Sequence, residues 1–147
     1  MLCAPMYFRA VALTGCFLLC GCSSFHREWK LAAKSPSTGL EGAWQGTWTS
    51  DVNRHTGKLR CVISKKEANS YSAHFRAKYF RILTFSYTVP LETQRSGDEF
   101  AFQGEANLGK LAGGVYEYKG QANRTNFTCS YSSEYDHGTF QMARAVQ

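Results

Sequence analysis

Apolar and polar residues alternate with a period of two along most of the chain after residue 41. Residues 71–79 show the pattern most clearly, with aromatic residues and alanine at the odd positions and Ser, His, Arg and Lys at the even ones. A period of two is typical of a β-strand that buries one face. The pattern predicts eight short strands, over residues 44–48, 59–63, 71–79, 84–91, 100–104, 115–121, 125–131 and 140–142.

The segments between these runs are short and rich in turn-forming residues, as in Asn53–Gly57, Ser96–Asp98 and Gly109–Gly114. None is long enough for the crossover helix that parallel strands need, so the strands should be antiparallel. Eight consecutive antiparallel strands in an open sheet leave two exposed edges, which closure into a barrel removes. We therefore predict an all-β fold, an eight-stranded antiparallel up-and-down β-barrel over residues 41–147, with a two-sheet sandwich as the alternative.

The first 21 residues are typical of a leader peptide. Arg9 is the only charged residue among them, and residues 10–20 are uncharged and largely apolar, as in a signal peptide. The apolar stretch is shorter than the about 20 residues that a helix needs to span a bilayer. Residues 22–40 are polar and irregular, which predicts a flexible tether with at most a helical turn around Glu28–Ala33.

The sequence Leu19-Cys20-Gly21-Cys22 resembles the lipobox of bacterial prolipoproteins. The resemblance implies a signal peptide over residues 1–21 and a lipid on Cys22. Leu13–Cys16 also fits the box, but cleavage there would leave a very short apolar stretch and an apolar start to the mature chain. An ordinary secretory leader and a buried N-terminal helix are the alternatives. A lipid on Cys22 implies a protein anchored to a membrane of the cell envelope, and Ser23 after it favours the periplasmic face of the outer membrane.

The formal charge of the chain is +6, and because Arg9 is the only charged residue before Cys22, the part after cleavage keeps +5. A basic protein can bind nucleic acid, anionic lipid or an acidic polymer. The Lys and Arg residues are spread along the chain, with only a mild concentration between Arg54 and Arg81. We interpret them as solvated side chains on the outer strand faces and expect no nucleic acid partner.

Cys61 and Cys129 are the cysteines that follow Cys22. The cell envelope permits a disulfide between them, which would close a long loop and stabilise the fold by roughly 4 kcal/mol on the chain-entropy model. Both, however, share a strand face with large apolar residues. Strands on opposite sides of a barrel would hold their Cα atoms beyond the roughly 7 Å that a bridge allows. A disulfide and two buried free thiols are therefore both open.

The two ends of the predicted barrel carry a family resemblance. Gly42-x-Trp44 on the first strand and Arg144 on the last are similar to the pattern of lipocalin and avidin-like (calycin) barrels. The resemblance implies that Trp44 closes one barrel end and that Arg144 packs across it as a cation–π pair. Trp44 as an ordinary core residue is the alternative. The middle resembles a group of small bacterial lipoproteins of unassigned function, through Tyr71-x-Ala73-x-Phe75, Gly113-Gly114-x-Tyr116-x-Tyr118 and Asp136-x-Gly138-x-Phe140.

A set of aromatic residues on the inward strand faces is the best candidate for a binding site within the barrel. These residues are Tyr71, Phe75, Tyr79, Tyr87, Tyr116, Tyr118 and Tyr131. Buried phenol hydroxyls need partners, which can be one another, ordered water or a ligand with apolar and polar parts. A filled, ligand-free core is the alternative.

Residues with catalytic or metal-binding chemistry are scattered along the chain. No Ser or Cys lies in a nucleophile-elbow setting, and neither the His nor the Cys residues have metal-ligand spacing. We therefore expect no enzyme activity, no metal and no cofactor. Two functions remain open. One is a membrane-anchored binding module for a small apolar or amphipathic ligand. The other is a structural or interaction lipoprotein of the cell envelope with a filled barrel and an unidentified protein partner.

Overall fold

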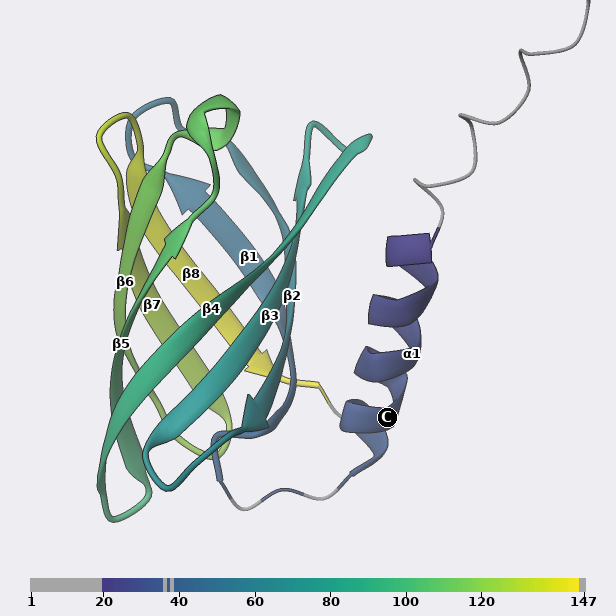
Figure 1. Ribbon diagram of the computed structural model, residues 1–147, viewed down its shortest axis with the longest axis vertical. Coiled ribbons are helices and arrows are strands. Elements are labelled where there is room, and N and C mark those ends of the chain that lie inside the picture. Colours follow the sequence, from purple (N-terminus) through teal and green to yellow (C-terminus); the bar gives the residue numbers. More distant parts are fainter. Residues whose placement is uncertain (1–19, 36, 38, 146–147) are drawn as a thin grey trace, which may run out of the picture.

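The structure, a computed structural model, describes residues 20–35, 37 and 39–145. Eight β-strands follow one another around a single closed barrel, and every neighbouring pair is antiparallel (Figure 1). The strands are β1 (Gly42–Ser50), β2 (Thr56–Lys65), β3 (Ser70–Tyr79), β4 (Leu83–Ser96), β5 (Glu99–Asn107), β6 (Val115–Ala122), β7 (Asn126–Ser132) and β8 (His137–Arg144). The predicted fold class is confirmed, and the two-sheet sandwich is excluded because β1 pairs with β8.

The alternation of side chains along the strands places the core inside the ring. On β7 the inward residues Phe127, Cys129 and Tyr131 are buried, whereas the residues between them are exposed. The inward residues of all eight strands form one buried cluster. Neighbouring strands approach closely at inward glycines such as Gly46 and Gly120, where a Cβ would collide with a carbonyl oxygen of the adjacent strand.

The two ends of the barrel are built differently. The connections β1–β2, β3–β4, β5–β6 and β7–β8 lie at one end, which we call the loop end (residues 51–55, 80–82, 108–114 and 133–136), uppermost in Figure 1. The β5–β6 connection contains the short 3-10 helix η1 (Lys110–Ala112). The other end, which we call the base, holds residues 66–69, 97–98 and 123–125, together with the segment that leads into β1.

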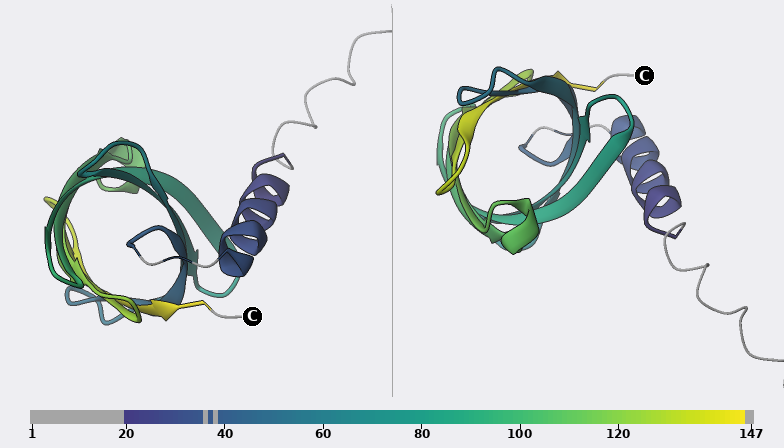
Figure 2. Two further views of the ribbon diagram at one scale, coloured as in Figure 1. Left: turned by 90° about the horizontal axis from the view of Figure 1, so that it is seen from below. Right: turned by 90° about the horizontal axis from the view of Figure 1, so that it is seen from above.

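Helix α1 (Cys20–Lys34) corrects the prediction of a flexible tether over residues 22–40. The helix lies outside the ring of strands, against the barrel wall (Figure 2). Phe25, Trp29, Ala32 and Ala33 follow one another at the spacing of one helix face. They pack on a second buried cluster that includes the outward-facing Val62 of β2. The helix forms because this apolar face has a partner on the wall, which the sequence alone did not reveal.

Polar and cation–π contacts hold α1 in register on β2 and β3. The His74 Nδ1 atom lies 2.9 Å from Glu28 Oε2, and the Phe25 ring meets the His74 ring edge-on at 4.9 Å. The Arg60 guanidinium lies 4.4 Å from the centre of the Trp29 ring. Exposed cation–π contacts stabilise by about 0.5–1 kcal/mol each, so they supplement the apolar packing. The N-terminal turn of α1 points toward the loop end and its last turn toward the base (Figure 1).

We predict that Phe25→Ala loosens α1 without unfolding the barrel. Phe25 is 1% exposed, and truncating a buried phenylalanine costs about 3 kcal/mol. The amides of residues 24–34 should therefore exchange faster with solvent deuterium, while those of β5–β7 keep their protection. Leu31→Ala is the matched control because Leu31, on the same helix, is 64% exposed. Equal exchange of α1 in the two variants would contradict the docked helix.

Candidate functional site

Trp44 and Arg144 meet at the base of the barrel. Trp44 is fully buried, and its indole Nε1 donates to the carbonyl oxygen of Leu40 at 3.0 Å. The Arg144 guanidinium lies 4.2 Å from the centre of the Trp44 ring. The structure thus brings together the two residues that the calycin resemblance pairs, and Leu40 is buried with them.

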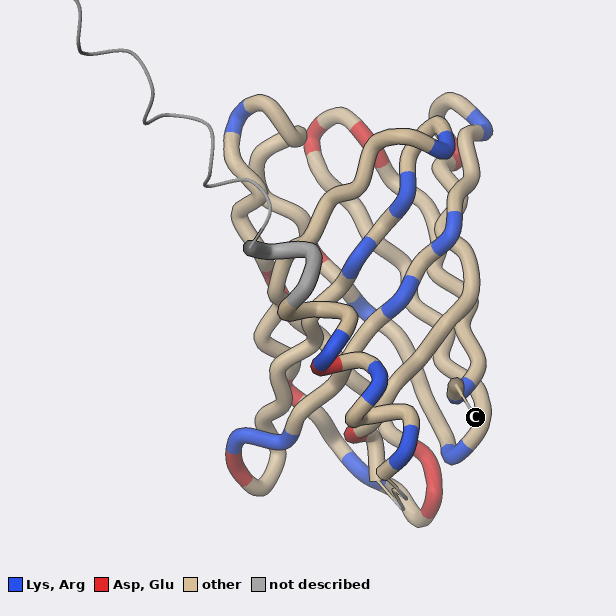
Figure 3. The backbone as a smooth tube through the Cα atoms, turned by 90° about the vertical axis from the view of Figure 1, so that its right-hand side faces the viewer, with Lys and Arg blue, Asp and Glu red and all other residues tan. Residues whose placement is uncertain are grey.

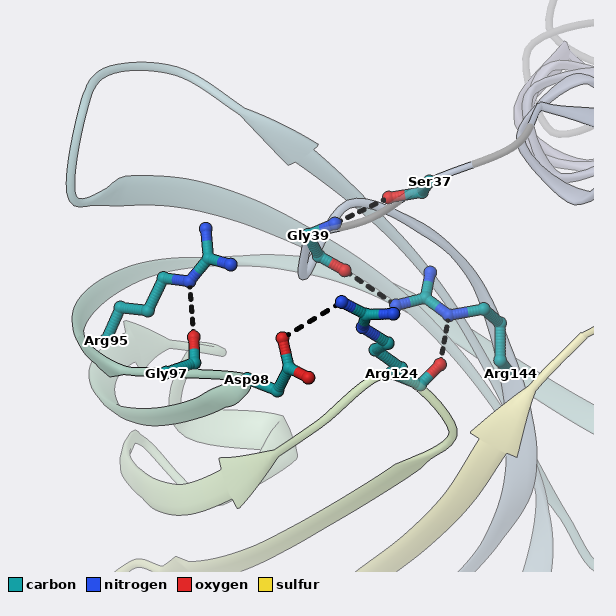
Figure 4. A network of polar contacts seen from close by, with 7 residues as sticks. All are labelled: Ser37, Gly39, Arg95, Gly97, Asp98, Arg124 and Arg144. Atoms are coloured by element: carbon teal, nitrogen blue, oxygen red, sulfur yellow. Dashed lines mark hydrogen bonds and ion pairs between the residues drawn. The ribbon is translucent and has the colours of Figure 1, made fainter.

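The Arg144 guanidinium also binds backbone carbonyl oxygens of two segments at the base, and Figure 4 shows the contacts to Gly39 and Arg124. Its Nε atom donates to the carbonyl oxygen of Arg124 at 2.7 Å, Nη1 to that of Glu41 at 2.8 Å and Nη2 to that of Gly39 at 2.7 Å. A planar guanidinium with several fixed donors suits this arrangement, whereas an ammonium group does not. Arg144 therefore holds the entry to β1 and the β6–β7 connection against the end of β8.

The seven predicted lining residues all belong to the inward core, but the structure does not gather them into one site. Five of them, with Phe140, form a continuous set of ring contacts in the middle of the lumen, with centroid distances from 5.1 to 6.3 Å; these are Phe75, Tyr87, Tyr116, Tyr118 and Tyr131. Tyr71 lies apart against Phe100. Tyr79 stacks on Trp48, with ring centres 5.5 Å apart.

Several of the phenol hydroxyls find partners within the protein. The Tyr79 hydroxyl lies 2.8 Å from His55 Nδ1. Burial raises the pKa of the Tyr87 and Tyr118 phenols above the ordinary value of 10. The Tyr131 hydroxyl lies 3.3 Å from Asp136 Oδ2, and burial, helped by the charge of Asp136, raises the pKa of Tyr131. A filled core requires that buried tyrosine hydroxyls find hydrogen-bond partners within the protein.

Hollows in the surface lie outside the lumen. Two hollows of about 860 Å³ each are found on the described part of the molecule. One crosses the outer wall of β4–β8 and is lined mainly by outward-facing polar residues. The other lies at the loop end, between the start of β2 and the end of β3. The interior of the barrel itself is occupied by the aromatic rings described above.

Cys61 and Cys129 are both buried and free. They lie on β2 and β7, which are separated around the barrel by β1 and β8. Burial raises the pKa of both thiols, that of Cys61 well above its ordinary value and that of Cys129 to about 12. Of the two possibilities left open by the sequence, the structure contains the free thiols.

The loop end carries the largest exposed apolar side chains of the described residues. Nine large apolar residues are exposed on the described part of the surface. Eight of them lie at or next to the loop end: Val52, Phe80, Ile82, Leu83, Phe85, Leu111, Val115 and Tyr135. All four loop-end connections or the strands next to them contribute. The exception is Leu31 on α1. Exposed apolar groups collected on one face are typical of a contact surface.

The β3–β4 hairpin stands clear of the next strand at this end. β4 pairs with β5 only from Leu91 onward, so residues 83–90 have β3 as their strand partner. In Figure 1 the tip of this hairpin diverges from β5 and β6 and lies on the side of α1. Its apolar residues therefore project beyond the filled part of the barrel.

Titratable side chains that could act in catalysis are used in structural contacts. His74 bonds Glu28 of α1, and His55 Nδ1 lies 2.8 Å from the Tyr79 hydroxyl. Among the residues with described positions, no group of three or more His, Cys, Asp and Glu side chains could hold a metal ion. Neither histidine lies beside a Ser or Cys in the hydrogen bonds described for it.

Cys22, the predicted lipid site, lies in the first turn of α1, and its side chain is outside the described part of the structure. The leader up to residue 19 is also outside it. No helix in the described part of the chain combines the length and the apolar character needed to cross a membrane. The structure therefore locates the backbone of Cys22 relative to the barrel, close to the docked Phe25.

Sequence reasoning missed two sets of residues at this stage. Phe25 and Trp29 could have been found from their spacing of four positions together with Val62, an apolar residue on the outward face of β2. Phe140, central among the lumen rings, could have been added from its inward parity on β8. The loop-end residues lie in connections that the antiparallel up-and-down order places at one end, so apolar residues within those short segments, such as Phe80, Ile82 and Leu111, could have been found from the sequence.

We predict that Arg144→Lys destabilises the fold by about 2–4 kcal/mol, because three carbonyl oxygens lose charged donors and the Trp44 ring loses its planar cation. Urea unfolding monitored by tryptophan fluorescence measures the loss. Arg95→Lys is the matched control: Arg95 also donates to a carbonyl oxygen, that of Gly97, and lies over Phe100, but it is exposed. A loss as small as that of Arg95→Lys would show that Arg144 does not hold the base together.

We predict that stability falls as the pH rises from about 9 toward 12. The buried Cys61, Cys129 and Tyr118 keep their protons in the folded state, whereas the unfolded chain releases them near its ordinary pKa values. The contribution of these protonated groups to the free energy of unfolding is therefore complete below pH 9 and is lost as the pH rises above 9. Urea midpoints at a series of alkaline pH values measure the slope, and Cys129→Ala should flatten it. A midpoint that stays constant to pH 11 would refute the assignment.

Comparisons with known proteins give no family for this chain, so the fold is assigned from the structure. No protein-family model, no curated protein and no solved structure matches the chain. The fold is therefore stated as the closed eight-stranded antiparallel barrel that the strand pairing defines.

Proposed function

We propose that the protein is a bacterial lipoprotein, cleaved before Cys22 and anchored by lipid on that residue, that serves the cell envelope as a non-enzymatic interaction module. The observation that carries the proposal is the pairing of a filled lumen with an apolar loop end. Rings occupy the interior, while Phe80, Ile82 and Leu111 are among the side chains exposed at one end. Exposed apolar surface is costly in water, and its concentration at one end favours contact with a partner.

The anchor is supported by the sequence and by the position of α1. Leu19-Cys20-Gly21-Cys22 follows an apolar stretch of signal-peptide length. Phe25, three residues after Cys22, is buried against the barrel wall. A lipid on Cys22 would therefore be held beside the barrel and not at the end of a long tether. The proposed location is the periplasmic face of the outer membrane, on the ground of Ser23.

A second candidate function is capture of a small amphipathic ligand. Tyr79, Tyr87 and Tyr116 are only partly buried, and they pack at the margin of the core cluster. Such a ligand would enter from the loop end and meet these rings with its apolar part. The mutual packing of the Phe75, Tyr87 and Tyr118 rings makes the filled barrel the first choice, because a ligand would have to displace these rings.

We predict that mass spectrometry of the protein purified from its own membranes will find diacylglycerol on a chain that begins at Cys22, with no small ligand retained. Cys22→Ala should abolish the lipid mass and membrane retention. Cys16→Ala is the matched control, because it removes the other lipobox cysteine and should change neither. A lipid on Cys16, or an unmodified chain in the soluble fraction, would refute the anchor. A stoichiometric small molecule would favour the second candidate.

A further inference from the structure

The tip of the β3–β4 hairpin concentrates exposed apolar side chains in six residues. Phe80 is 61% exposed, Ile82 is 84%, Leu83 is 49% and Phe85 is 50%. Residues 83–90 lack a partner on the β5 side, so the tip projects from the barrel. Four large apolar groups on one projecting hairpin bury little surface in the isolated protein, and they would each gain by leaving water.

The backbone of the tip adopts an energetically costly conformation. Phe80 and Arg81 have φ angles of 49° and 64°, in the left-handed region that glycine or asparagine adopts more readily. The Phe80 ring packs edge-on against the rings of Tyr79 and His55, with centroid distances of 4.4 and 4.7 Å. The tip is thus a supported structure that presents bulky residues where small ones would cost less.

A basic hollow lies directly beside the tip. Its lining includes Lys58, Lys78 and Arg81 together with Phe80, and it contains no Asp or Glu. Asp51 is the acidic residue of the neighbouring β1–β2 connection, which also carries Arg54. Figure 3, which faces the side of the barrel that α1 covers, shows further Lys and Arg on the strands above the helix. Apolar groups next to clustered cations match the boundary of a membrane with anionic headgroups.

The position of α1 aligns this surface with the proposed lipid. Phe25 contacts His74 on β3, the strand that ends at the hairpin tip, and the N-terminal turn of α1 points toward the loop end (Figures 1 and 3). Cys22 precedes Phe25 by three residues, about 4.5 Å along a helix. A lipid on Cys22 would therefore enter the bilayer on the same side of the barrel as the tip.

We propose that the β3–β4 tip inserts into the interfacial region of an anionic lipid bilayer, with a lipid phosphate in the hollow formed by Lys58, Lys78 and Arg81. This proposal rests on the proposed function, because the lipid on Cys22 would hold the tip at the membrane surface. It gives the loop end a defined partner, the lipid surface itself. The lipid on Cys22 is one contact with the membrane, and the hairpin tip would be a second. Two contacts would fix the orientation of the barrel on the membrane, whereas acyl chains on one residue would not.

Vesicle binding by a chain that cannot be lipidated tests the tip separately from the anchor. The chain from residue 22 with Cys22→Ser contains all eight strands and residues 22–34 of α1. It should sediment with vesicles of phosphatidylglycerol and phosphatidylcholine, bind less to phosphatidylcholine alone, and dissociate as salt is raised. Inorganic phosphate at millimolar concentration should not compete beyond the effect of its ionic strength, because the apolar tip requires a lipid surface.

Paired variants give the decisive comparison. Ile82→Asp should weaken vesicle binding about tenfold, because one apolar side chain at an interface is replaced by a charge. Leu31→Asp, an exposed leucine on α1, should leave binding unchanged. Lys78→Glu should weaken binding to anionic vesicles, whereas Lys66→Glu, at the base, should not. Circular dichroism confirms that each variant is folded.

The proposal is overturned if the chain does not bind anionic vesicles, or if Ile82→Asp and Leu31→Asp have the same effect. Binding of an extended peptide along the free edge of β4, with no binding to vesicles, would also overturn it and assign the loop end to a protein partner. Failure of the anchor is seen independently: vesicle binding with an unmodified Cys22 in the native protein refutes the lipid on Cys22 and leaves the hairpin contact standing.

Discussion

The pairing of β1 with β8 is the constraint on which the molecule depends, because it closes the sheet and makes eight inward faces share one interior. Aromatic rings fill much of that space, and the Tyr131 hydroxyl bonds nearby acidic and backbone oxygens. Arg144 reinforces the closure at the base, where it contacts Trp44 and three carbonyl oxygens from two separate segments. The end at which the chain enters the barrel is consequently tied together by Arg144.

The two ends of the up-and-down barrel differ in the side chains that they carry. The base receives the segment from α1 and is tied by Arg144, so its polar groups serve the fold. The loop end has polar contacts of its own, such as the hydrogen bond from Ser50 Oγ to Asp136 Oδ1 at 2.6 Å. Its connections also carry apolar side chains that contribute little to the core. A membrane contact at this end would use the residues that folding does not need. Such a contact would bury the apolar side chains that are exposed to water in the isolated barrel.

Helix α1 links the two proposals. Its apolar face is buried on the wall of β2 and β3, which fixes the distance between Cys22 and the barrel. A lipid at the start of a docked helix holds the domain close to the membrane, whereas a lipid on a flexible tether would let it rotate and move away. The same packing brings Arg60 and His74 into contacts with Trp29 and Glu28, so the basic side chains on this face have structural roles as well.

The sequence by itself determined the eight strands, their antiparallel order and the inward direction of the seven aromatic residues, because alternation with a period of two is a local property of each strand. The proximity of Trp44 and Arg144 was anticipated through a family resemblance and not through local pattern. Only the tertiary structure decided that residues 20–34 form a docked helix, because its stability depends on Val62 and Ala43 from distant strands. The antiparallel order already places these connections at one end, but only the tertiary structure decided that Phe80, Leu111 and Tyr135 are exposed there, since exposure depends on how the neighbouring strands pack.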